Sequence, residues 1–127
     1  MALEDVQANP MMNHLVEALD RGKNIGHYGR LVFVMVSQYF LTENEIVALL
    51  TKDPDCDDEK ARIILKQVKA HGYNPPKPDR ILAWMNEQDF PICESADQDK
   101  DACNVYKSLK FPPEVYERIA NYYQDQR

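Results

Sequence analysis

Basic residues gather in two short stretches of the chain, and side chains of this type can bind phosphate. Between residues 60 and 80, six lysines and arginines stand against a single acid, Asp79. Within this stretch Arg62, Lys66 and Lys69 are spaced to share one face of a helix. Arginine and lysine donate hydrogen bonds to phosphate oxygens, so this face is a candidate phosphate-binding surface. The alternative is a solvated helix face without a ligand. The second basic group consists of Arg21, Lys23, His27 and Arg30.

The overall charge limits the kind of nucleic-acid binding that these groups can support. The chain has 127 residues and a formal net charge of −6, which disfavours binding of long duplex DNA by bulk electrostatics. This average hides the basic segment, because acids concentrate instead in residues 53–59 and 94–101. Any binding of nucleic acid is therefore expected to be local, weak and strongly dependent on salt.

Three cysteines offer little support for a metal centre or a disulfide framework. Cys56, Cys93 and Cys103 are too few for a disulfide scaffold, and they lack the close pairing that is usual for zinc ligands. We therefore expect no metal site. The cysteines are expected to be buried or free thiols in a reducing intracellular setting. Acids alternate over residues 53–57 as in a calcium loop, but the required Gly and Glu are missing, so a solvated acidic loop is expected.

The spacing of apolar residues predicts an all-α fold, a single compact domain of about six helices spanning residues 1–127. Segment 31–41 is apolar on all sides, and its length favours a central buried helix over a strand. Thr42 and Glu45 form a capping box, Asp79 is expected to cap a later helix, and Gly72 to end another. The expected helices cover residues 10–21, 31–41, 42–53, 57–70, 79–85 and 112–123.

No hydrolase, P-loop or metalloprotease motif is present, so the chain is not expected to be an enzyme by itself. The longest apolar run, residues 31–36, is too short to span a bilayer, and the N-terminus has no pattern of an export signal. A cytoplasmic, nucleoid-associated location is expected, with no contact to membranes.

Several short motifs occur together in a fixed order. They are Asn9-Pro10-Met11, Arg21-Gly-Lys-Asn-Ile-Gly-His27-Tyr-Gly-Arg30, Leu41-Thr-Glu-Asn-Glu-Ile46, Asp53-Pro-Asp55, Tyr73-Asn-Pro-Pro-Lys-Pro78, Cys93 and Cys103. In this order, the stretch from Pro10 to Tyr123 resembles the C-terminal domain of the archaeal and eukaryotic DNA primase large subunit. That domain is all helical, in agreement with the reading of the residues.

The resemblance also bears on a cofactor. In the family, four cysteines hold a [4Fe–4S] cluster, and Cys93 and Cys103 stand at the third and fourth ligand positions. The first two positions hold Met11 and Pro78, and a cluster of this kind needs four thiolates. No iron–sulfur cluster and no other cofactor is expected. The chain is thus similar to cluster-free relatives such as the small archaeal accessory subunit PriX or the helix-bundle domain of plasmid primases.

The resemblance implies a non-catalytic primase module that binds the initiating nucleoside triphosphate and single-stranded DNA template. The family's H-x-x-R pair, which contacts the triphosphate, is matched by His27 and Arg30 near the start of a helix. Arg62 and Lys66 are expected to add phosphate contacts. Residues expected to contact template are Lys69, Tyr28 and Tyr73, the tyrosines by stacking on bases. The implied partner is a catalytic primase subunit or a fused catalytic domain.

Two other functions remain open. The chain could be a protein-interaction adaptor that keeps the fold without a ligand site and docks a partner through its acidic loops and the Tyr122-Tyr123 end. It could also be a metal or redox module that uses its three thiols.

Overall fold

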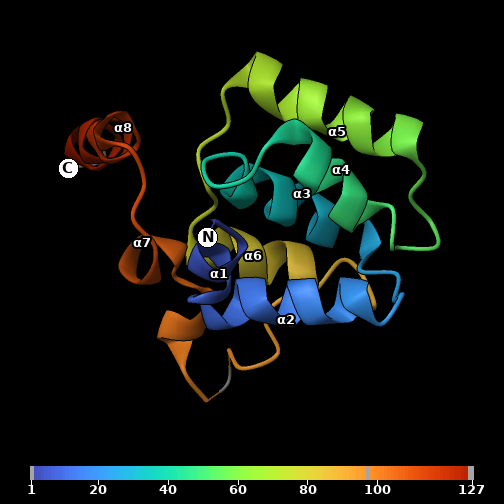
Figure 1. Cartoon of the computed structure of the whole chain (residues 1–127). Helices are drawn as coiled ribbons and strands as arrows, with labels where there is room; N and C mark the ends of the chain where they lie inside the picture. Colours follow the sequence, from blue (N-terminus) through green and yellow to red (C-terminus); the bar gives the residue numbers. More distant parts are fainter. Residues whose placement is uncertain (1, 97, 126–127) are drawn as a thin grey trace.

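The structure is a computed structural model that describes residues 2–96 and 98–125, without the side chains of residues 2, 100 and 120–125. The predicted Tyr122-Tyr123 surface lies outside the described side chains. The described helices, with one short 3₁₀ helix η1, pack around one apolar core (Figure 1). They are α1 (Ala2–Gln7), α2 (Pro10–Asp20), α3 (Gly26–Ser37), α4 (Glu43–Leu50), α5 (Asp58–His71), α6 (Pro78–Met85), η1 (Lys100–Cys103), α7 (Val105–Ser108) and α8 (Pro113–Asp125).

Helix α3 is the centre of the domain, as its uniformly apolar sequence predicts. It packs against α2, α4, α5 and α6, so apolar side chains on all its faces are covered. Helix α5 lies on one side of it and α2 on the other (Figure 1). The predictions of an all-α fold and of a central buried helix are confirmed, and no strand occurs among the described residues.

The helix ends follow local rules at most positions. Thr42 and Glu45 form the predicted capping box of α4. Asp57 accepts a hydrogen bond from the Lys60 N–H at the start of α5, and Gly72 ends that helix in the left-handed conformation, with φ 60°. The predicted cap at Asp79 is wrong, because α6 begins one residue earlier, at Pro78, and Asp79 lies inside its first turn.

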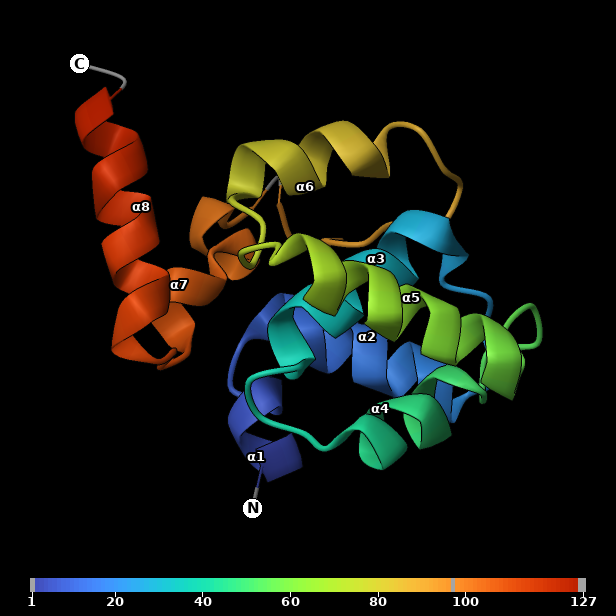
Figure 2. The same ribbon diagram turned by 90° about the horizontal axis from the view of Figure 1, so that it is seen from above.

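The C-terminal third is built from short pieces. The acid-rich segment after α6 ends in η1, and Asn104 joins η1 to α7. Helix α8 stands beside the rest of the bundle, beyond α7 (Figures 1 and 2), and Val115 in its first turn is fully buried. No described helix is both long enough and apolar enough to cross a membrane.

Candidate functional site

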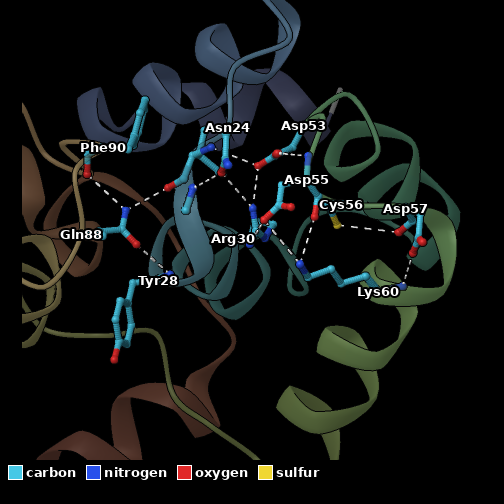
Figure 3. A network of polar contacts seen from close by, with 12 residues as sticks. Asn24, Tyr28, Arg30, Asp53, Asp55, Cys56, Asp57, Lys60, Gln88 and Phe90 are labelled. Atoms are coloured by element: carbon cyan, nitrogen blue, oxygen red, sulfur yellow. Dashed lines mark hydrogen bonds and ion pairs between the residues drawn. The ribbon is translucent and has the colours of Figure 1, made fainter.

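Arg30 lies in a buried polar network at the start of α3 (Figure 3). Its Nη1 atom is 2.8 Å from Asp53 Oδ2 and 3.2 Å from Asn24 Oδ1, and its Nη2 atom is 3.6 Å from a carboxylate oxygen of Asp55. The Arg30 side chain is only 3% exposed, and that of Asp53 is 0% exposed. Asp53 is therefore a buried ion-pair partner, and the expectation of a fully solvated acidic loop is wrong at this residue.

The Asp53 carboxylate accepts hydrogen bonds from donors that an external anion would need, although Arg30 Nε is buried without a partner among the described residues. Besides Arg30, it accepts hydrogen bonds from the N–H groups of Ile25, at 3.0 Å, and Asp55, at 2.8 Å. A guanidinium with adjacent backbone N–H groups is a common arrangement for binding phosphate. Here an internal carboxylate holds that position, so Arg30 forms a buried ion pair in this structure, and the predicted contact between Arg30 and a phosphate stays a prediction.

The backbone amides at the start of α3 are also occupied. The Gly26 N–H donates to Asn24 Oδ1 and the Tyr28 N–H donates to Gln88 Oε1, each at 2.9 Å. The Gln88 amide nitrogen donates in turn to the carbonyls of Ile25 and Phe90. Gly26 has a φ of +80°, and a Cβ there would come within 2.5 Å of the Gln88 amide, so the close fit requires glycine. The backbone N–H groups of Gly26 and Tyr28, on either side of His27, are therefore not available to bind an anion.

His27 itself is exposed and begins a row of stacked side chains, which we call the aromatic ladder (His27, Tyr28, Trp84 and Arg80). The His27 and Tyr28 rings meet edge to face with centroids 5.3 Å apart. Tyr28 stacks on Trp84 at 5.5 Å and an interplanar angle of 17°, and the Arg80 guanidinium lies 5.8 Å from the centre of the Trp84 ring. The ladder joins α3 to α6 and combines flat apolar faces with a cation.

Tyr28 is held at its outer end by Glu87. A hydrogen bond from the Tyr28 hydroxyl to the Glu87 carboxylate, with the negative charge of Glu87, raises the pKa of the phenol. The tyrosine is thus neutral at physiological pH. Tyr28 was predicted to stack on a base; in the structure one face already stacks on Trp84.

A groove of about 720 Å³ opens beside the ladder, and Arg80 and Trp84 belong to both. Tyr73, 43% exposed, stands at the groove and stacks on His71 with centroids 5.1 Å apart. The groove is lined by Leu31, Met35, Tyr73, Asn74, Pro75, Pro76, Lys77, Asp79, Arg80, Trp84, Tyr106 and Ile119. Exposed aromatic faces beside basic side chains are the usual components of sites for nucleotides and single strands.

Trp84 and Arg80 were not predicted as site residues. In the sequence, Trp84 fits the apolar face of a short helix, and Arg80 counts only as one of the six basic residues. Their separation of four residues on a helix places them on one face, which is the only signal that could have suggested a stacked pair.

The predicted basic face of α5 is formed but partly neutralised. Arg62 pairs with Asp58 at 2.9 Å, and Lys69 pairs with Glu43 of α4 at 2.8 Å. The bond to Lys69 and its positive charge lower the pKa of the Glu43 carboxyl. Lys66 lies exposed on α5 between them in sequence. The three basic residues therefore differ in how readily they can contact a phosphate, and Lys66 carries the least opposed charge.

Two of the three cysteines are joined. Cys93 and Cys103 form a disulfide between the segment after α6 and η1, and both residues are 1% exposed. Cys56 is a buried free thiol, and burial raises its pKa. The expectation of free thiols is wrong for the first two, because the turn between residues 93 and 103 brings their Cα atoms to 6.0 Å.

The residues at the four cluster positions do not fit a [4Fe–4S] group. Proline at position 78 has no ligating atom, Met11 offers a buried thioether in place of a thiolate, and the remaining two sulfurs are bonded to each other. Among the described residues, no group of three or more His, Cys, Asp or Glu side chains is arranged to hold a metal ion. The absence of a cofactor stays a prediction.

Comparison with known proteins gives two related sequences. The chain is 32% identical over 95 residues to the DNA primase large subunit PriL of Archaeoglobus fulgidus, covering 68% of this chain and 26% of that protein. It is 29% identical over 93 residues to PriL of Thermoplasma acidophilum, covering 66% of this chain and 27% of the relative. This chain is a relative of the DNA primase large subunit.

The primase-related domain spans about a quarter of the length of these curated relatives. No family model and no solved structure matches it. The predicted resemblance to the large subunit is confirmed, together with the helical fold.

Proposed function

We propose that this domain is a non-catalytic accessory module of a DNA primase. It binds the initiating nucleoside triphosphate and single-stranded template during primer synthesis. The similarity to PriL supports the link to a primase, and a separate catalytic subunit or fused domain would form the phosphodiester bond. The observation that carries the ligand-binding part is the aromatic ladder opening on the groove beside Tyr73.

Bases and phosphates find different partners in this arrangement. The exposed Tyr73 ring offers a flat surface on which a base can stack, which is worth about 1–3 kcal/mol per base, and Trp84 lines the same groove. Arg80 and Lys77 line the same groove and supply positive charge for phosphate oxygens. Because stacking does not depend on the identity of the base, this proposal fits a module that accepts varied template sequences.

Arg30 takes a positioning role in this proposal. It anchors the start of α3 through Asp53 and Asn24, and the two residues that begin the ladder, His27 and Tyr28, lie in the first turn of that helix. His27 remains a candidate phosphate ligand, because its ring is exposed at the end of the ladder. In this proposal, the H-x-x-R motif supplies a candidate phosphate ligand, His27, and a residue that holds the start of α3 in position, Arg30.

The single tryptophan of the chain provides a direct test. Trp84 is part of both the ladder and the groove, so a bound base should change its fluorescence. The protein would be titrated with Mg-ATP and with a short oligothymidylate at low salt. We expect saturable quenching, and we expect Tyr73→Leu to weaken it. The control Phe40→Leu changes an aromatic residue outside both the ladder and the groove, and it should leave the quenching unchanged.

The opposite result has a clear meaning. If millimolar Mg-ATP and the oligonucleotide leave the Trp84 emission and the mobility of a labelled strand unchanged, the ligand-binding proposal is overturned. The adaptor function would then be the better account of a retained fold.

A further inference from the structure

The Cys93–Cys103 disulfide closes a loop that lies next to the groove. Cys93 follows α6, which carries Arg80 and Trp84, and Cys103 ends η1, directly before α7. Both α6 and α7 contribute side chains to the groove. The disulfide therefore links the segment that follows α6 to the segment that precedes α7.

Both ends of this link contact groove elements. The Cys93 N–H donates to the Met85 sulfur at 3.5 Å, one residue after Trp84, and η1 packs against α6. On the other side, Tyr106 of α7 lines the groove, and its hydroxyl donates to the Pro75 carbonyl in the Tyr73–Pro78 turn. A shift of η1 would therefore move α6 and with it Trp84. It would also move Tyr106 and, through its hydrogen bond, the turn at Pro75.

Contacts from α2 hold the loop from outside, independently of the disulfide. The His14 ring stacks on Phe90, and its two nitrogens lie 2.9 Å from the Pro91 carbonyl and 3.2 Å from a Glu94 carboxylate oxygen. The Asn9 amide donates to the Ala102 carbonyl at 3.2 Å. These contacts keep the two sulfurs near each other after the bond is broken, so opening of the disulfide is expected to loosen the loop and to be reversible.

We propose that the Cys93–Cys103 pair is a redox-controlled latch that sets the shape of the groove. A dithiol reductant transfers two electrons and two protons: the S–S bond breaks, two thiols form, and the reductant becomes a disulfide. The closed latch holds α6 and α7 in the geometry that presents Trp84 and Tyr106 to the groove. The effect on ligand binding rests on the proposed function, and the effect on α6 and α7 does not.

The test compares oxidised and reduced protein in a Cys56→Ser background, so that thiol counts report only on the pair. Maleimide labelling before and after treatment with dithiothreitol measures the bond, and amide hydrogen exchange measures α6 and α7. We expect two thiols to appear and the exchange of α6 and α7 amides to accelerate at least several-fold. Exchange in α4, which lies away from the disulfide, should stay constant. Reoxidation by a small disulfide, which takes up the two electrons and two protons and becomes two thiols, should restore the slow exchange.

A second measurement separates this inference from the proposed function. Mg-ATP affinity, read from Trp84 fluorescence, should fall several-fold on reduction and in the Cys93→Ser/Cys103→Ser variant, which is permanently open. If oxidised protein binds no nucleotide but the exchange of α6 and α7 still responds to reduction, the latch stands and the proposed function fails. If exchange and affinity are equal in both redox states, or if the purified protein has no disulfide after exposure to air, the latch is overturned.

Discussion

The Arg30 guanidinium and the Asp53 carboxylate meet at 2.8 Å, with both side chains almost completely removed from solvent. The pair joins the start of α3 to the turn between α4 and α5, and Ile25 and Asn24 add hydrogen bonds to it. A buried charge is stable only when it is paired and hydrogen-bonded. The relationship therefore assigns the Arg30 of the H-x-x-R motif to the architecture of the site.

Replacement of Arg30 by Ala should destabilise the domain severely. The change leaves the Asp53 carboxylate buried without its cationic partner, which typically costs about 3–5 kcal/mol. Urea unfolding followed by circular dichroism measures the loss. The matched control is Lys52→Ala, which breaks an exposed pair with Asp20 whose side chains are 47% and 53% exposed. That change should cost at most about 1 kcal/mol. An Arg30→Ala protein of unchanged stability would contradict the structural role.

Arg80→Gln tests the cationic end of the aromatic ladder. The substitution removes the charge over Trp84 and one positive side chain of the groove, while the fold should be retained because Arg80 is exposed. We expect a loss of oligonucleotide affinity of roughly fivefold to tenfold, equivalent to about 1–1.4 kcal/mol. Fluorescence anisotropy of a labelled single strand measures it. Lys52→Gln removes the same charge elsewhere and should leave the affinity within about twofold.

Variants of Lys66 and Arg62 test whether a bound single strand crosses the basic face of α5 or stays at the groove and the ladder. If template also crosses α5, Lys66→Gln should reduce the slope of log affinity against log salt concentration by about 0.7, the value for one single-strand phosphate. Arg62→Gln should change the slope less, because Asp58 already opposes the Arg62 charge. Equal, unchanged slopes in both variants would confine the ligand to the groove and the ladder.

The Glu43–Lys69 pair predicts a small dependence of stability on acid. Lys69 lowers the pKa of Glu43 in the folded domain. The contribution of this pair to the free energy of unfolding is therefore fully present above the ordinary pKa of a glutamate. It is lost as the pH falls through the lowered value. NMR titration of the Glu43 carboxyl should show the lowered pKa, and Lys69→Gln should return it towards the ordinary range. The exposed position of the pair makes the effect on unfolding modest.

Local sequence rules predicted those helices that have strong end signals and a regular apolar face. The capping box at Thr42 and the Asp57 and Gly72 ends of α5 are formed by residues within a few positions of each other. Helices α1 and α7 were missed, because six and four residues are too short for a periodic pattern to be recognised.

The site was predicted only in part, because its decisive contacts join residues far apart in the chain. Arg30 is 23 residues from Asp53, and Gln88 is 60 residues from Tyr28. A basic residue in a motif looks the same whether it will face solvent or a buried carboxylate. Likewise, Trp84 could be assigned to the apolar face of α6, but nothing in the sequence shows that it stacks on Tyr28.

The position of Asp53 also has a thermodynamic consequence. A ligand stabilises a protein when it binds the folded state more tightly than the unfolded state. The Asp53 carboxylate already accepts hydrogen bonds from Arg30 Nη1 and from the Ile25 N–H, and only the buried Arg30 Nε atom among these donors lacks a partner in the described part of the chain. A free phosphate would have to displace the Asp53 carboxylate to bind there. Phosphate in the medium is therefore expected to leave the melting temperature unaffected through these donors. Stabilisation by a nucleotide would report binding elsewhere, at the groove, His27 or the basic face of α5.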